Sequence, residues 1–99
     1  MDDALAEVRL QFRQRCSGDL LTLRAAMRQP QALTAASFQT MVHRMAGIAG
    51  SLGFTPLGAA AAAVDRACSR RASIDPAGLR RLEIALSEVA DPLCDPAAQ

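Results

Sequence analysis

Residues 38–53 read FQTMVHRMAGIAGSLG, and the spacing of their apolar side chains decides the expected fold. At about 100° per residue, one arc of a helix collects Phe38, Met41, Val42, Met45, Ile48, Ala49 and Leu52. His43 falls nearly opposite the centre of that arc. The pattern predicts an amphipathic helix from about residue 32 to residue 52, the longest in the chain, which buries the arc and exposes the histidine.

Helical spacing recurs before this segment. The apolar positions there are Leu5, Val8, Phe12, Leu20, Leu23 and Met27. Ser17, Gly18 and Asp19 interrupt the pattern, which predicts two helices or one broken helix before Pro30.

Proline and leucine patterns mark two further helices after it. Thr55 before Pro56 predicts an N-cap, Asp75 before Pro76 repeats that signal, and Asp91 before Pro92 predicts the end of the last helix. One face of that helix carries Leu79, Leu82, Leu86 and Val89. Since no segment alternates with period two, we expect an all-α fold. It would be an up-and-down antiparallel four-helix bundle with an additional N-terminal helix. Residues 1–99 would form one domain, with its core at about 17–90 and a frayed tail at 92–99.

Composition narrows the classes of function. The 99 residues suffice for one core, which must be mostly aliphatic because Trp and Tyr are absent. The net charge is only +1, so no global field favours nucleic acid or a membrane as partner. Three widely spaced cysteines suggest neither a disulfide framework nor a zinc site. The chain shows no signal sequence and no apolar stretch of about twenty residues, so we expect a soluble cytoplasmic protein.

Small residues surround His43 on the predicted solvent face. Gln39 lies one turn before it, Ala46 and Gly47 one turn after, and Gly50 two turns after. Each interior glycine costs a helix about 1 kcal/mol relative to alanine, so two glycines weaken this helix. Their placement favours close approach of another protein to the imidazole, although tight packing against a neighbouring helix is an alternative.

The segment that begins at His43, HRMAGIAGSLG, resembles the pattern H-x-L-K-G-x-A-x-x-L-G of the histidine-containing phosphotransfer (HPt) domains of bacterial two-component phosphorelays. The register continues without a gap. Leu57 falls on a leucine position of the family's next helix, and Val64 and Asp65 fall where that helix commonly has Leu-Glu. The resemblance implies that His43 is the phosphorylated residue.

One position departs from the family pattern. The usual lysine three residues after the histidine is Ala46, and the chain contains no lysine. Arg44 is a possible substitute, but it lies about 100° around the helix from His43. We expect Gln39, Arg44, Ala46 and Gly47 to neighbour the phosphoryl group.

We expect Gly50 and Ser51 to belong to the docking surface. The resemblance implies a monomeric phosphoryl carrier between receiver-domain aspartates, with receiver domains or a hybrid histidine kinase as partners. It implies no metal or other cofactor on this chain, with Mg²⁺ on the receiver. No phosphate-binding loop is present, so ATP-dependent kinase activity is not expected.

The alternative function is a binding module of the same fold that regulates a receiver or kinase without carrying phosphate, and Ala46 is its best support. A small acid/base enzyme built on His43 has little support, because no carboxylate or nucleophile lies one turn away and the flat stripe of small residues offers no evident pocket.

Overall fold

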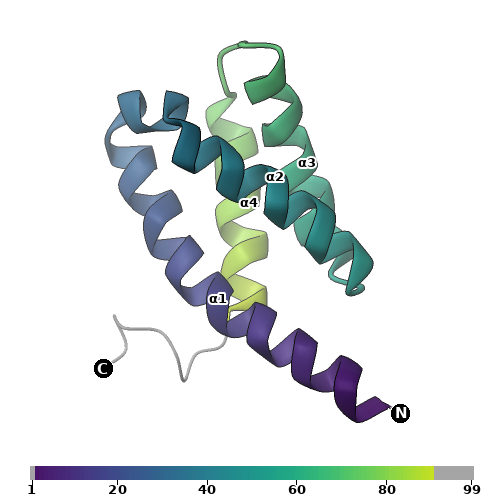
Figure 1. Cartoon of the computed structure of the whole chain (residues 1–99). Helices are drawn as coiled ribbons and strands as arrows, with labels where there is room; N and C mark the ends of the chain where they lie inside the picture. Colours follow the sequence, from purple (N-terminus) through teal and green to yellow (C-terminus); the bar gives the residue numbers. More distant parts are fainter. Residues whose placement is uncertain (1, 91–99) are drawn as a thin grey trace.

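The computed structural model describes residues 2–90, which contain four α-helices and no strand. The helices are α1 (Asp2–Arg28), α2 (Ala36–Ser51), α3 (Thr55–Ser69) and α4 (Pro76–Val89), with a 3₁₀ helix, η1 (Pro30–Thr34), between α1 and α2. Figure 1 shows α2 and α3 as an antiparallel hairpin beside α1 and α4. The all-helical prediction is confirmed. No helix within residues 2–90 combines the length and apolarity needed to cross a membrane.

The helix α1 is continuous through the predicted interruption. Gly18 is exposed with no atom near its missing side chain, whereas Cys16, Ser17 and Leu20 are buried. Burial on both sides of Gly18 outweighs the cost of about 1 kcal/mol for one helical glycine. The structure therefore does not confirm an additional N-terminal helix.

The prediction that the His43 helix is the longest is wrong. The helix α1 has 27 residues and α2 has 16. Residues 30–34 form the 3₁₀ helix instead of the first turns of α2, and Ala35 adopts an extended conformation with ψ 139° before α2 begins. The start of α2 is therefore set by this backbone break.

The predicted core face of α2 is confirmed. Every residue of the arc except Ile48 is buried, and Ile48 at its edge is half-buried. The same core takes Leu57, Ala61 and Val64 from α3. These contacts leave the opposite side of α2, which carries His43, facing solvent.

Of the two N-caps predicted within the described residues, at Thr55 and at Asp75, only the second has the expected chemistry. Before them, Gly53 directly follows the C-cap residue Leu52 and ends α2 with a φ of 89°, a left-handed conformation that favours glycine. The side chain of Asp75 accepts a hydrogen bond from the backbone N–H of Ala77 at 3.0 Å. The predicted N-cap at Thr55 is wrong: the cap position is Phe54, whose ring stacks on Phe12 at 5.5 Å. Packing rather than a capping hydrogen bond fixes this boundary. The expected stop at 91–92 and the expected frayed tail at 92–99 lie outside the described residues.

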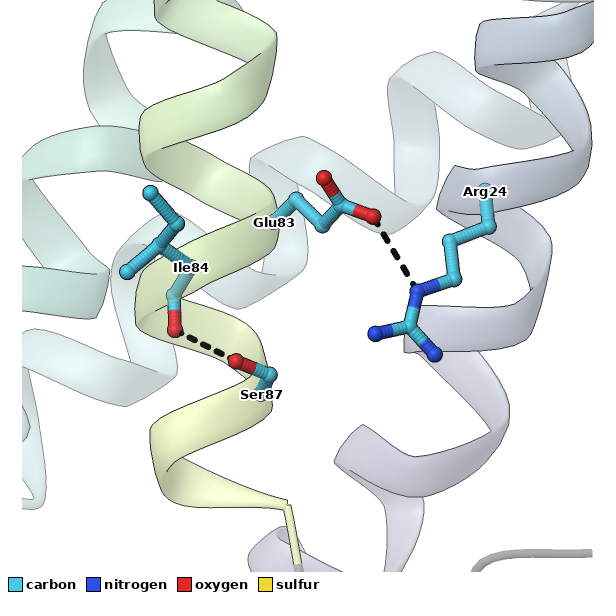
Figure 2. A network of polar contacts seen from close by, with 4 residues as sticks. All are labelled: Arg24, Glu83, Ile84 and Ser87. Atoms are coloured by element: carbon cyan, nitrogen blue, oxygen red, sulfur yellow. Dashed lines mark hydrogen bonds and ion pairs between the residues drawn. The ribbon is translucent and has the colours of Figure 1, made fainter. Parts of the chain in front are cut away.

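Polar side chains of α1 connect it to the other helices. Arg24 forms an ion pair with Glu83 of α4 at 3.1 Å (Figure 2). Closer to the N-terminus, Arg9 Nε donates to the carbonyl of Leu52 at 2.9 Å, and Arg13 Nε donates to the carbonyl of Val89 at 3.0 Å. The exposed N-terminal part of α1 is thus tied to the ends of α2 and α4 (Figure 1).

Candidate functional site

His43 projects from the middle of α2, on the side away from the core. Its side chain is 79% exposed. The neighbours on its own helix leave it open, because a Cβ atom added at Gly47 or at Gly50 would meet nothing within 4 Å beyond its chain neighbours and the local helix backbone. A second protein can therefore approach the imidazole over this face.

Close packing of α2 on α3 sets which residue of α3 faces the histidine. A Cβ added to Gly58 would lie 3.1 Å from the backbone N and 3.3 Å from the Cα of Gly50, so the two helices touch backbone to backbone there. Seven residues, about two helical turns, separate Gly50 from His43 and Gly58 from Asp65. Because the hairpin is antiparallel, the same register brings His43 and Asp65 together.

The contact between these two side chains orients the imidazole. His43 Nδ1 lies 3.0 Å from Asp65 Oδ2, and the aspartate is only 23% exposed. A carboxylate can only accept a hydrogen bond, so Nδ1 carries the hydrogen and donates it. In the neutral imidazole this leaves the lone pair on Nε2, the ring nitrogen that has no protein partner among the described residues.

The structure places some of the other predicted neighbours of the phosphoryl group near the imidazole and one of them in the contact between α2 and α3. Gln39 lines a hollow of about 280 Å³ together with His43, Asp65 and Cys68. Gly47 is exposed, whereas the backbone oxygen of Ala46 faces α3, 3.8 Å from the Cβ position of Gly58. Ala46 therefore belongs to the helix contact more than to the surface around the imidazole.

The predicted docking residues Gly50 and Ser51 are exposed. The Ser51 hydroxyl donates to the carbonyl of Gly47 at 3.1 Å, so its polar group is used within α2. The outer side of Gly50 is open, and its backbone contacts Gly58. Gly50 thus serves both predicted roles, since it leaves room for a second protein and packs closely against a neighbouring helix. Gly47 serves only the first role.

Arg44 connects α2 to α1. Its guanidinium donates to Asp19 Oδ2 at 2.9 Å in a partly buried ion pair. Burial raises the pKa of the Asp19 carboxyl above its usual range, and attraction to Arg44 opposes that shift. The structure uses the Arg44 side chain to hold two helices together, on a different side of α2 from Asp65.

Sequence reasoning missed Asp65 as a site residue. The residue pattern around His43 lies on one helix, whereas Asp65 reaches the imidazole from the next helix. The available signal was the hairpin register, because Asp65 lies twelve residues after Gly53 and His43 ten residues before it.

Comparison with known proteins places the chain in a family. The family model described as "Hpt domain" matches residues 7–92. No curated protein and no solved structure shows significant similarity to the chain. The chain belongs to the Hpt domain family, whose members are phosphoryl carriers in two-component phosphorelays and interact with receiver domains and histidine kinases.

Proposed function

We propose that His43 Nε2 accepts a phosphoryl group from the aspartyl phosphate of one receiver domain and passes it to the aspartate of another. The observation that carries this proposal is the contact of Nδ1 with Asp65 at 3.0 Å beneath a ring that is 79% exposed. One nitrogen is held by the protein and the other is free to react.

The proposed transfer follows from this geometry. The Nε2 lone pair attacks phosphorus while the bond from phosphorus to the aspartate oxygen breaks, and that electron pair returns to the receiver carboxylate. The Nδ1 hydrogen stays in place, so the phosphorylated ring is cationic. The Asp65 carboxylate stabilises this cation through a charge-assisted hydrogen bond. Transfer to the second receiver reverses these bond changes.

The receiver would supply the remaining electrostatic stabilisation. Arg44 is engaged with Asp19, and the family's lysine position holds Ala46. We therefore assign the Mg²⁺ ion and the cations around the transferring phosphoryl group to the receiver and no cofactor to this chain. The open face over Gly47 gives that active site room to reach the ring.

Phosphotransfer from a panel of ³²P-labelled receiver domains tests the proposal. We expect acid-labile label on the chain and none on His43→Gln, with unchanged thermal stability because the side chain is exposed. Proton–nitrogen NMR of the labelled protein should place the phosphoryl group on Nε2. Label on the His43→Gln variant would refute the site.

A binding module that carries no phosphate is the second candidate, and Ala46 in place of the family's lysine is the observation that favours it. Such a module would bind a receiver without acquiring label from any member of the panel. Binding of a receiver without transfer of label would therefore contradict the carrier function and support the binding module.

A further inference from the structure

The most exposed large apolar side chain in the described part of the chain is Ile84 of α4, at 51%. It lies on the side of α4 that points away from Arg24 and α1 (Figure 2). Isoleucine is not favoured there by helix formation, because β-branched side chains form helices less readily than long unbranched ones. One exposed apolar side chain is ordinary on a protein surface, so the surroundings of Ile84 decide whether it has a partner.

Ile84 borders an apolar groove between α3 and α4, called here the α3–α4 groove. The groove has a volume of about 420 Å³, and no residue of α1 or α2 lines it. Its α3 side consists of small side chains, among them Ala59, Ala60 and Ala63. Since no large side chain of α3 fills the groove, an apolar side chain from outside the molecule can enter it.

The charges of α4 make this surface complementary to itself. Arg81, Ile84, Ala85 and Glu88 follow the spacing i, i+3, i+4, i+7, which places them on one face of the helix. Arg81 and Glu88 are exposed, and neither forms an ion pair within residues 2–90. They lie equally far from a centre between Ile84 and Ala85. If a second copy of α4 lies antiparallel across this centre, each Arg81 faces the partner's Glu88.

We propose that the α3–α4 groove is the interface of a homodimer with two-fold symmetry, in which Ile84 of each copy enters the groove of the other. Charge complementarity selects a second copy as the occupant, because an interface of this symmetry must be complementary to itself. One two-fold axis forms both ion pairs between Arg81 and Glu88 at once. The dimer takes the place of the monomer that the family resemblance implies.

The size of the groove sets the expected strength of the dimer. Arg81 and Glu88 are seven residues apart, so the contact spans roughly 10 Å along α4. Contacts this small bind weakly, and we expect a dissociation constant on the order of 0.1 mM. No residue of α2 lines the groove, so His43 stays open in both copies. Dimerisation is therefore independent of phosphoryl transfer.

Dilution of the unmodified chain is the first test. Equilibrium sedimentation from about 10 µM to about 1 mM should show a mass that rises toward twice that of one chain. Over the same range, the backbone amides of residues 56–63 and 80–88 should shift in ¹⁵N-labelled protein. A mass that stays at one chain throughout, or shifts confined to α1 and α2, would overturn the inference without any variant.

Charge reversal tests the antiparallel register. Arg81→Glu or Glu88→Arg alone sets like charges against each other in both pairs, so each variant should self-associate about tenfold more weakly at low salt. An equal mixture of the two variants forms two opposite-charge pairs again in a heterodimer. Association of the mixture should therefore return to within about threefold of the parent value. A mixture that stays monomeric would contradict the proposed register.

Arg70→Glu and Glu7→Arg are the matched control pair. Both residues are exposed, lie outside the α3–α4 groove, form no ion pair in the described part of the chain and give the same changes in net charge. Each control variant, and their mixture, should self-associate within about twofold of the parent at moderate salt. Thermal melting checks that all four variants fold. Equal effects of the two pairs would show a response to net charge and would refute the interface.

Discussion

The close contact between α2 and α3 can be measured with two glycines that receive the same substitution. Gly58→Ala places a methyl group 3.1 Å from the backbone N and 3.3 Å from the Cα of Gly50. Gly47→Ala places the same group in open space on α2. Each change gains about 1 kcal/mol of helix propensity, so this gain largely cancels when the two variants are compared.

The difference in unfolding free energy between the two variants therefore measures the cost of separating the backbones of α2 and α3. Overpacking of this kind costs about 1–3 kcal/mol, and no flexible side chain lies at the contact to absorb it. We therefore expect Gly58→Ala to be less stable than Gly47→Ala by about 1–3 kcal/mol. The Tm values should differ by roughly 4–8 °C per kcal/mol for a domain of this size.

Urea titration and calorimetry give the free energies and Tm values. A movement of α3 away from α2 should also lengthen the contact of His43 with Asp65, so the imidazole NMR signals should change in Gly58→Ala and stay as they are in Gly47→Ala. Equal stabilisation of the two variants would refute the contact and the register derived from it.

Three further predictions concern the site and the core. Asp65→Asn keeps a hydrogen-bond acceptor at Nδ1 but removes the negative charge. The phosphorylated state should lose about 1–2 kcal/mol of stabilisation, and transfer to His43 should slow by about tenfold. An unchanged rate would show that Asp65 only orients the ring. Gly47→Gln should raise stability by up to about 1 kcal/mol. It should reduce phosphoryl transfer from a receiver but not from phosphoramidate, a small phosphoryl donor that needs no docking surface. A destabilised variant with normal transfer would contradict the open face at Gly47. Burial raises the pKa of the Cys16 thiol from 9.0 to about 12. The folded state therefore keeps a proton that the unfolded chain loses as pH rises above about 9, and stability should fall by up to about 1.4 kcal/mol per pH unit. Urea titrations at pH 8.5–10.5 should show a shallower fall for Cys16→Ala, and an identical slope would refute this assignment.

Periodic features of the fold were predictable from the sequence. The burial of Met45 and the exposure of His43 follow from the spacing of apolar residues, because the face of an amphipathic helix is a local property. The continuity of α1 was not predictable from Gly18, since local propensity is weaker than the burial of Cys16 and Leu20 around it. Tertiary packing decided the outcome there.

Of the two residues of the candidate site, only His43 was predictable from the sequence. His43 could be found from its neighbours on one helix, whereas the position of Asp65 depends on the register of α3 relative to α2. That register is fixed by the turn at Gly53 and by the contact of Gly58 with Gly50, both of which require the hairpin to be folded. The position of Arg44 has the same origin, because its partner Asp19 lies on a third helix.

The two arginines near the N-terminus of α1 have a consequence for how the bundle opens. Helix ends usually fray first, because their last carbonyls lack partners in the helix. Here Arg9 and Arg13, one turn apart, hold the carbonyls of Leu52 and Val89. Local unfolding of this part of α1 would release both carbonyls at once, so the last turn of α4 and the residues that close α2 lose protection against hydrogen exchange together, as one cooperative unit.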